Sequence, residues 1–396
     1  MYIKEVKVIL KAGVKMERYY VDHAATSPLH PDVIEVMTET MKNTFGNPSS
    51  IHSFGREARR IIDEARGSIA DSIHADFQEI IFTSGGTEAD NLALMGVAYK
   101  NRARGKHIIT SQIEHHAVLH TCEALEKQGF EVTYLPVDSQ GFVSVQDVKA
   151  ALRDDTILVS IMFANNEVGT VQPIKAIGDL LTDHPAYFHT DAVQAYGLLP
   201  IDVREMGIDL LSVSAHKLNG PKGIGFLYAK TGVRFTPALY GGEQERKRRA
   251  GTENVPAIAG FKKAVDISQM ERGKKIAIYE QLRTSFIETL KTSGIDFKIN
   301  GAEKNYLPHI VNISFPGTNV EQMLVNLDLE GIAVSSGSAC TAGSLEPSHV
   351  LSAMYGHQAD ELTNSIRFSF GYGITLEQTI TIAEKTVKVV KRLTGK

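Results

Sequence analysis

Short apolar runs alternate along the chain, from about residue 30 to 260, with longer segments whose apolar residues recur at helical spacing. Runs of this length, bounded by polar residues, are typical of buried strands, and the longer segments are typical of helices. The runs cover 79–84, 107–111, 131–137, 156–163, 186–191, 209–214 and 224–229, with helices predicted at 87–103 and 117–128. This alternation predicts an α/β fold, in which helices cover a largely parallel sheet of roughly seven strands.

The pattern changes after about residue 257. A long helical stretch at 257–292 is followed by apolar strands at 309–315 and 366–370 and by a terminal helix from about 376. With 396 residues the chain exceeds the ~250–300 at which single cores stop growing, so we expect a second, smaller α+β domain. The predicted division is an N-terminal segment packing with the small domain, a large domain and a small C-terminal domain, at 1–29, 30–262 and 263–396.

Composition changes this picture little. The net charge is -4, and 43% of residues are hydrophobic and 22% charged, which gives no sign of a nucleic-acid or membrane partner. Two cysteines, Cys122 and Cys340, are too few for a disulfide framework and fit a reducing cytoplasm. No run reaches the ~20 apolar residues of a membrane span, and the N-terminus lacks the pattern of a secretory signal. We therefore expect a cytoplasmic protein.

Polar and glycine-rich motifs follow four of the predicted strands. They read TSGGTEAD, NNEVG, HTDAVQA and SAHK, in chain order. Ligands bind at the carboxyl ends of the strands in an open α/β sheet, so these motifs are expected to meet in one site.

Lys217 lies in the last of these motifs, SVSAHKLNGPKGIG at 212–225. It is either an ordinary surface lysine or an amine that forms a Schiff base with an aldehyde cofactor after losing its proton in a desolvated site. Asp191 ends a buried strand and needs a cation, for which a protonated pyridine nitrogen is suitable, unless it is a simple helix cap. Gln194 lies close enough in sequence to reach a ring hydroxyl from the same side.

The segment TSGGTEADN, at 83–91, joins a strand to a helix through two glycines. Backbone amides at such a helix start favour a phosphate, although an ordinary turn is the alternative. Thr87 and Asp90 resemble a loose capping box. Neither G-x-G-x-x-G nor a P-loop motif occurs, which argues against dinucleotides and nucleoside triphosphates.

Three further positions are candidates. His115 follows the strand at 107–111 and offers a flat ring for stacking on a planar ligand. His116 and His120 have the i,i+4 spacing of two metal ligands on a helix, but a third ligand is lacking, so no metal site is expected. Cys340 lies among small residues in SSGSACTAGS, whereas Cys122 is expected to be buried in a helix. The planar guanidinium group of Arg367 could bind a carboxylate, with support from Asn166. The run ERKRR at 245–249 is interpreted as a solvated loop.

Together these motifs closely resemble those of cysteine desulfurases, pyridoxal-phosphate (PLP) enzymes of the class V aminotransferase family. The matching segments are DHAATSP, FGNPSSIH, SGGTEADN, NNEVG, HTDAVQ, SAHKLNGPKGIG, GTEN, SSGSACTAGSLEPSHVL and IRFSFG, over residues 17–385. The long segment around Cys340, followed by LEPSHVL, is similar to the NifS/IscS-like group. The resemblance implies the aspartate aminotransferase-like fold of type I PLP enzymes, with a seven-stranded mainly parallel sheet.

The resemblance also implies a role for each candidate. Lys217 would hold PLP as a Schiff base, His115 would stack on the ring, Asp191 would bind the pyridine nitrogen and Gln194 the phenolic oxygen. The expected phosphate ligands are Gly86, Thr87, Ser214 and His216, with Thr252 from the second subunit of a homodimer. Arg367 and Asn166 would bind the carboxylate of L-cysteine, with Asn166 also near the cofactor.

The implied reaction removes sulfur from L-cysteine, leaving L-alanine and a persulfide on Cys340. An iron–sulfur scaffold or a tRNA-thiolating enzyme would then accept the sulfur. The alternatives are a selenocysteine lyase or another class V aminotransferase, and, in a different class, an inactive scaffold for iron–sulfur assembly. An aminotransferase would not need Cys340, and a scaffold would need none of Lys217, His115 and Asp191.

Overall fold

The computed structural model describes residues 17–336 and 347–395. Its central feature is a seven-stranded sheet in the order β2-β8-β7-β6-β5-β3-β4, in which only β8 runs antiparallel to its neighbours. The strands are β2 (Ile80–Thr83), β3 (His107–Ser111), β4 (Glu131–Leu135), β5 (Thr156–Ser160), β6 (Tyr187–Asp191), β7 (Leu210–Ser214) and β8 (Gly225–Ala229). Each apolar run predicted to form a strand of this sheet does so, and the mainly parallel α/β fold is confirmed.

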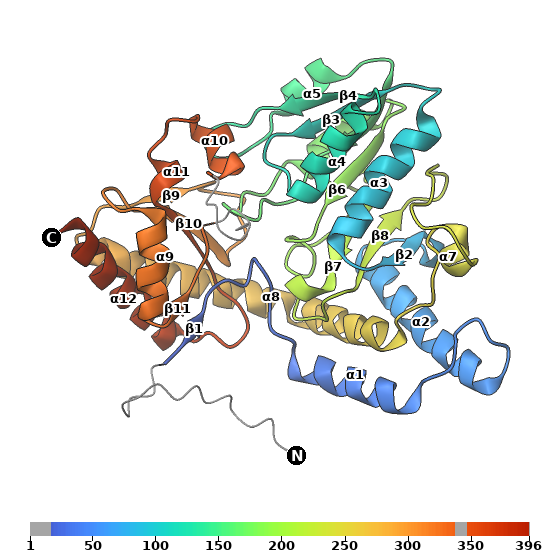
Figure 1. Ribbon diagram of the computed structural model, residues 1–396, viewed down its shortest axis with the longest axis horizontal. Helices are drawn as coiled ribbons and strands as arrows, with labels where there is room; N and C mark the ends of the chain where they lie inside the picture. Colours follow the sequence, from blue (N-terminus) through green and yellow to red (C-terminus); the bar gives the residue numbers. More distant parts are fainter. Residues whose placement is uncertain (1–16, 337–346, 396) are drawn as a thin grey trace.

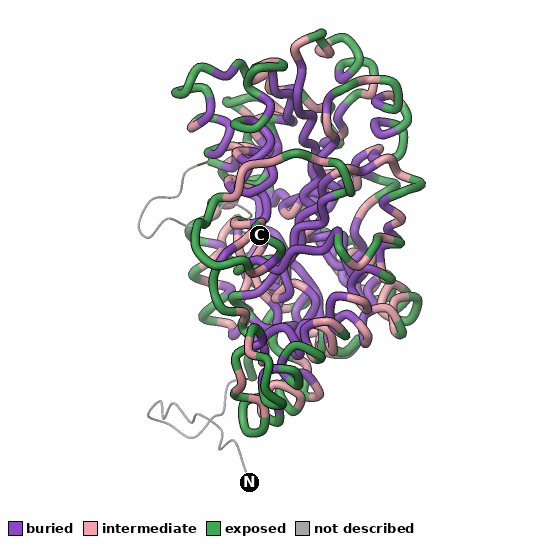
Figure 2. The backbone as a smooth tube through the Cα atoms, turned by 90° about the vertical axis from the view of Figure 1, so that its right-hand side faces the viewer, coloured by how far each residue is buried: buried purple, intermediate pink, exposed green. Residues whose placement is uncertain are grey.

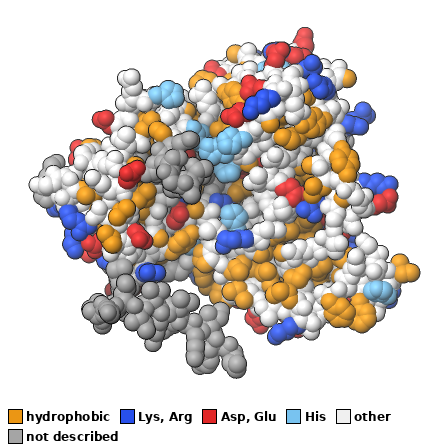
Figure 3. Space-filling model, viewed as in Figure 1, with side chains coloured by type: hydrophobic (Ala, Val, Ile, Leu, Met, Phe, Trp, Pro, Cys, Tyr) orange, Lys and Arg blue, Asp and Glu red, His pale blue; other side chains and the backbone are white. Residues whose placement is uncertain are grey.

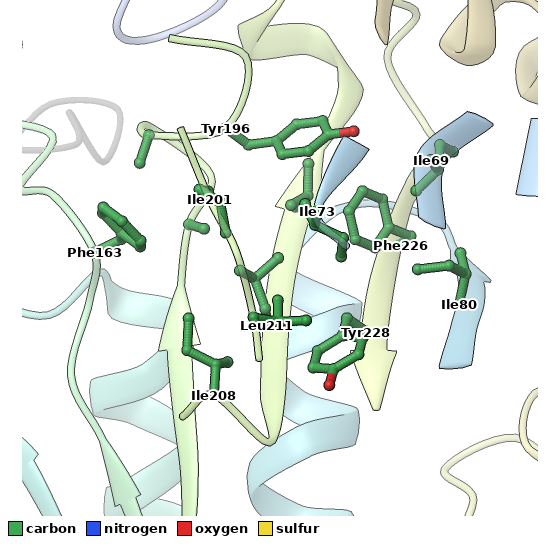
Figure 4. Packing of buried hydrophobic residues seen from close by; sticks show 14 of the residues in the cluster. Ile69, Ile73, Ile80, Phe163, Tyr196, Ile201, Ile208, Leu211, Phe226 and Tyr228 are labelled. Carbon is green, nitrogen blue, oxygen red and sulfur yellow. The ribbon is translucent and has the colours of Figure 1, made fainter. Parts of the chain in front are cut away.

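Both faces of this sheet are buried, because successive strand residues point to opposite sides and both sides are apolar. Ile80 and Phe82 of β2 join one core cluster, while Ile81 between them joins another. In the first cluster, Ile69 of a helix lies next to Phe226 and Ile80 of the sheet (Figure 4). This two-sided burial explains why the sequence shows continuous apolar runs rather than strict alternation.

Helices cover the two faces (Figure 1). Those on the face of the second cluster are α3 (Gly86–Asn101) and α4 (His116–Glu126). On the other side lie α1 (Pro31–Asn43), α2 (Ser53–Ser72), α5 (Val145–Ala151), α6 (Ile174–Leu181) and the start of α8 (Val255–Thr292), with α1 packed on α8. Figure 2 shows the same layering, with buried chain inside and exposed chain outside. Short 3-10 helices, Phe77–Glu79 and Ala215–Lys217, and α7 (Gln244–Lys247) complete this part.

The C-terminal part is smaller and has its own core. An antiparallel sheet of β9 (Lys298–Asn300), β10 (Ile310–Ser314) and β12 (Ser365–Ser369) packs against α9 (Val320–Leu329), α12 (Leu376–Thr394) and the second half of α8. The N-terminal β1 (Tyr19–Tyr20) pairs with β11 (Ile332–Ala333) of this part. Two short helices, α10 (His349–Tyr355) and α11 (Glu361–Asn364), lie between β11 and β12 in sequence. The predicted strands at 309–315 and 366–370 and the terminal helix are confirmed.

The long helix α8 connects the two parts (Figure 1) and runs unbroken through residues 262 and 263. The proposed domain boundary therefore stays a prediction. None of the helices in the described part of the chain is long and apolar enough to cross a membrane.

Candidate active site

The predicted site residues converge on one cavity of about 460 Å³ at the carboxyl edge of the large sheet. This edge is where β2, β3, β5, β6 and β7 deliver the residues that follow them, so the strand order itself assembles the site. The predicted residues that line the cavity are Gly86, Thr87, His115, Asn166, Asp191, Gln194, Ser214, His216, Lys217 and Arg367. Ten positions spread over 282 residues of sequence, from 86 to 367, thus share one pocket.

Lys217 ends the short 3-10 helix that follows β7, and its side chain enters the cavity. The Nζ atom donates hydrogen bonds to the backbone oxygens of Ala24 and, at 2.8 Å, of Ala25. Burial and, to a smaller extent, the positive charge of Arg367 lower the pKa of the amine to about 8, while Asp191 opposes the shift. A substantial neutral fraction near physiological pH makes this lysine a nucleophile rather than a surface charge.

Asp191 is the last residue of β6, and no helix begins after it, so the helix-cap alternative is wrong. Its Oδ1 accepts a hydrogen bond of 2.9 Å from the backbone N–H of Val193. Burial raises the pKa of the carboxyl to about 6, against the influence of Lys217. A cationic N–H donor in the cavity would favour the ionised form of this carboxylate. Gln194, three residues on, donates from Nε2 to the backbone oxygen of Ala24 at 2.9 Å.

His115 is the N-cap of α4, and its Nδ1 accepts a hydrogen bond of 3.1 Å from the backbone N–H of Ala117. The ring is exposed because it borders the open cavity, yet protein surrounds it closely enough to lower its pKa to about 4. Desolvation is the main cause, followed by the charge of Lys217. The imidazole is therefore neutral, with its hydrogen on Nε2, and offers a flat uncharged face.

The glycine pair at the start of α3 forms a backbone cradle. Gly85, the N-cap, has a φ of +152°, and a Cβ on Gly86 would lie 2.7 Å from Cγ2 of Val193. Both positions therefore need glycine, which leaves helix N–H groups open to an anion. The predicted capping box of Thr87 and Asp90 is wrong. The N-cap is Gly85 and no side chain caps the helix, while the backbone N–H of Ser84 donates to Glu88 at 2.8 Å.

Arg367 reaches the cavity from β12 and is only 4% exposed, so it is no surface ion pair. Its guanidinium donates from Nη2 to Asp22 and from Nη1 to the backbone oxygen of Asn166, both at 2.8 Å. Among the described residues its buried Nε has no hydrogen-bond partner. One edge of the fork is therefore already held in place, and a donor remains for an anionic ligand.

One predicted site residue among those the structure describes is not brought to this cavity. Thr252 is exposed and does not line it. Cys340 lies outside the described residues. The expectation that 245–249 is a solvated loop is also wrong in part, because Glu245 is buried and forms a two-pronged ion pair with Arg66, with N···O distances of 2.6 and 2.7 Å.

Three carboxyl groups that were not predicted as site residues belong to this region. Asp22 holds Arg367, and Asp90 of α3 lines the cavity while its Oδ1 lies 3.5 Å from Nε2 of His189. Burial raises the pKa of Asp90 well above its ordinary value, and that of Glu114 to about 8. The one signal for Asp90 was an acid on the otherwise apolar face of the predicted helix.

Histidine side chains gather near the centre of the face that carries the cavity (Figure 3). The rings of His116 and His120 stack with centroids 4.9 Å apart, and His349 lies 4.8 Å from His116. Over residues 17–336 and 347–395, no group of three or more potential ligands is arranged to hold a metal ion. Cys122 is fully buried in the core on the α3–α4 side, as expected.

Comparison with known proteins gives consistent matches over most of the chain. The family model described as Aminotransferase class-V matches residues 19–379. A Bacillus subtilis (strain 168) protein named "Putative cysteine desulfurase IscS 1" is 63% identical, covering 96% of this chain and 100% of its own. "Cysteine desulfurase IscS" of Dictyoglomus turgidum is 50% identical over 94% and 95% of the two chains. The solved structure "SspA in complex with cysteine" has a TM-score of 0.78 at 38% identity, covering 89% and 98%.

Proposed function

The chain belongs to the class V aminotransferase family, and from this premise and the geometry of the cavity we propose that it is a PLP-dependent cysteine desulfurase. The observation that carries the proposal is the meeting of Lys217, Asp191 and His115 in one cavity. A lysine with a lowered pKa, a buried carboxylate and a neutral flat ring are the three groups that a pyridine aldehyde requires. The relatives named cysteine desulfurase supply the reaction.

The cavity fits PLP residue by residue. Lys217 would hold the aldehyde carbon, Asp191 the pyridine N–H, and His115 one face of the ring, with Gln194 at the phenolic oxygen. The phosphate would occupy the cradle at the start of α3, where a side chain on Gly86 would collide with Val193. The remaining ligands there would be Thr87, Ser214 and His216, and burial keeps His216 mostly neutral by lowering its pKa to about 4. When bound, PLP supplies an electron sink for bonds at the substrate carbons.

The chain's own residues then perform the remaining steps. Arg367, with Asn166, binds the carboxylate of L-cysteine, and the Lys217 amine removes and returns protons at the substrate carbons. The Cys340 thiolate attacks the substrate sulfur, the carbon–sulfur bond breaks, and its electron pair stays with the carbon, which takes up a proton. L-cysteine and the Cys340 thiol thus become L-alanine and a Cys340 persulfide, with the sulfur oxidised and the carbon reduced.

A homodimer completes the proposed site. Thr252 would come from a second copy to the phosphate, which agrees with its exposure away from the cavity of its own chain. An apolar surface supports a second copy: Phe45 is 75% exposed and Ile51 90%, and Phe45 packs against Phe54 at 5.1 Å. Hydrophobic side chains are visible at the lower right of Figure 3, in the region where Figure 1 places α1, α2 and the loop between them. Patches of this kind on soluble proteins mark interfaces.

Sulfur acceptors complete the proposed pathway. The persulfide would pass in the cytoplasm to an iron–sulfur scaffold or to a tRNA-thiolating enzyme. Neither acceptor requires the protein to contact nucleic acid or a membrane.

Incubation with L-cysteine tests the proposal. The purified protein with PLP is expected to form L-alanine and protein-bound sulfane sulfur in equal amounts on a single turnover. The Cys340→Ala variant should keep the visible colour of bound PLP but form neither product, whereas Cys122→Ala, at the buried cysteine, should form both. Undiminished alanine formation by Cys340→Ala would remove this residue from the mechanism and favour another class V aminotransferase. A protein that stays colourless after addition of PLP would favour the inactive scaffold.

A further inference from the structure

Helix α10 is part of the C-terminal region by sequence but packs against the large sheet's side of the molecule. Its inward face consists of Val350, Leu351 and Met354. These side chains form a separate buried cluster with Ile113 and Met162, which follow β3 and β5, and with Val168. Figure 1 shows α10 apart from α9 and α12, at the boundary between the two parts. The helix is therefore docked beside the cavity rather than in the small core.

A buried hydrogen bond fastens the N-terminal end of α10. The Ser348 hydroxyl donates to Oε2 of Glu167 at 2.5 Å, and its oxygen accepts from the backbone N–H of Leu351 at 3.0 Å, which caps the helix. Ser348 and Glu167 are 5% and 1% exposed. The backbone N–H of Glu167 is itself held by Oδ1 of Asn165 at 2.8 Å. A buried carboxyl group has no water to replace a lost partner, so this bond strongly favours the docked position.

A second fastening lies one residue further on. His349 makes a hydrogen bond of 2.9 Å from Nε2 to the backbone oxygen of Glu114, directly before His115. Since a carbonyl oxygen only accepts, Nε2 carries the hydrogen. The ring of His349 also packs on His116, which stacks in turn on His120. Both fastenings therefore end on the loops that carry the predicted cofactor and substrate ligands His115 and Asn166.

The other end of the same stretch of chain is attached to the small part. Ser335 forms a bridge with Arg367 of β12, in which the Arg367 N–H donates to the Ser335 oxygen at 2.7 Å. The described residues on the two sides of this stretch, which contains Cys340 in sequence, are thus attached to different parts: Ser335 to β12 and Ser348 to the large part. The cavity, lined by both Ser335 and His349, lies between these attachment points.

We propose that Glu167, Ser348 and His349 are positioning residues for sulfur transfer, because they fix the C-terminal end of the Cys340 segment beside the cavity by docking α10. The inference rests on the proposed function, since Cys340 is taken as the sulfur acceptor. None of the three residues would act on the substrate, so their loss should slow persulfide formation without changing how cysteine binds.

Two substitutions at Glu167 test this. Glu167→Leu removes the acceptor at nearly constant volume, whereas Glu167→Gln keeps a carbonyl oxygen for the Ser348 hydroxyl. In the PLP-loaded protein, Glu167→Leu is expected to raise amide hydrogen exchange in residues 350–355 and to slow single-turnover persulfide formation about 10- to 100-fold, because small displacements of a reacting group cost that much. The change in PLP absorbance on adding L-cysteine should keep its wild-type rate within about twofold.

The conservative and control variants separate positioning from general damage. Glu167→Gln should restore both persulfide formation and slow exchange. Ser352→Ala, on the same helix at a hydroxyl with no hydrogen bond among the described residues, should behave as wild type. Unchanged persulfide formation or unchanged exchange in Glu167→Leu would overturn the inference, and so would an equal loss of the cysteine-induced absorbance change. A wild-type protein that makes no alanine would instead overturn the proposed function, and the exchange data would still decide whether Glu167 docks α10.

Discussion

Lys217 is the residue whose chemistry depends most on its surroundings. Its amine would lose its proton near pH 10.4 in water, but burial and the charge of Arg367 bring its pKa to about 8. Asp191, with a carboxyl pKa raised to about 6, is ionised at neutral pH and offsets part of this shift. The residue is thus prepared for condensation with an aldehyde before any ligand arrives.

The rate at which PLP-free protein takes up PLP should therefore depend on pH with a midpoint near 8. Below the midpoint the reactive neutral amine decreases about tenfold per pH unit, so loading should slow in proportion, and above it the rate should level off. Stopped-flow absorbance after mixing with PLP measures this profile. Lys222→Ala, at an exposed neighbouring lysine, should leave it unchanged. A midpoint above 10 would show that the burial of Lys217 does not lower its pKa.

Site residues that directly follow a strand were easier to identify from the sequence than site residues that depend on partners distant in sequence. Lys217, Asp191 and Asn166 were predictable because the carboxyl ends of strands in an α/β sheet share one edge. Asp90 and Glu114 were not, because a carboxyl group acquires its raised pKa from burial by residues distant in sequence. Asp22 was overlooked because its partner Arg367 lies 345 residues away in the sequence.

At the scale of elements, the buried pair of Arg66 and Glu245 joins α2 to the segment that leads toward Thr252. The guanidinium also donates to the backbone oxygen of Ile80 at 2.6 Å and lies over the ring of Phe82 at 4.9 Å. Glu245 holds this position with a φ of +47°, a conformation that costs energy for a residue other than glycine. The pair therefore stabilises a backbone shape that the local sequence does not favour.

Replacing Arg66 by Met should leave the Glu245 carboxylate buried without its partner and lower the free energy of unfolding by about 3–5 kcal/mol. Arg60→Met, on the same helix, removes an exposed pair with Glu64 and should cost no more than about 1 kcal/mol. Urea unfolding followed by circular dichroism compares the two. Equal effects would mean that the contacts of Arg66 in the core do not determine stability.

The same region shows why element prediction was uneven. Most strands of the large sheet were predictable because burial on both faces makes their sequences largely apolar, whereas the edge strand β4 is only partly buried. The run ERKRR has the composition of a solvated loop, and nothing local marks Glu245 as buried, since its partner Arg66 is 179 residues away. Helix α10 is similar, because its docking on the large part depends on Ile113 and Met162 rather than on its own pattern.

For the whole molecule, the question is whether a single chain holds a complete site. The cavity gathers the residues proposed to bind the ring, the nitrogen and the substrate carboxylate from one chain, but Thr252 stays outside it. If Thr252 serves the phosphate of a second copy, every active site depends on two chains, and a C2 arrangement supplies two such sites.

Mixed dimers of Lys217→Ala and Thr252→Ala chains distinguish the two arrangements. If Thr252 acts across the interface, one site of the mixed dimer lacks both residues and the other site has both. The mixed dimer should then bind one PLP with wild-type affinity and form alanine at about half the wild-type rate per dimer. If Thr252 acts within its own chain, no site is intact, because one lacks Lys217 and the other lacks Thr252. Co-expression with two affinity tags, followed by PLP titration, gives the measurement, and a dimer of Lys217→Ala with a wild-type chain sets the value for one intact site. Activity no higher than half that of the Thr252→Ala homodimer would place Thr252 outside the partner's site, and the exposed apolar surface around Phe45 would then need another explanation.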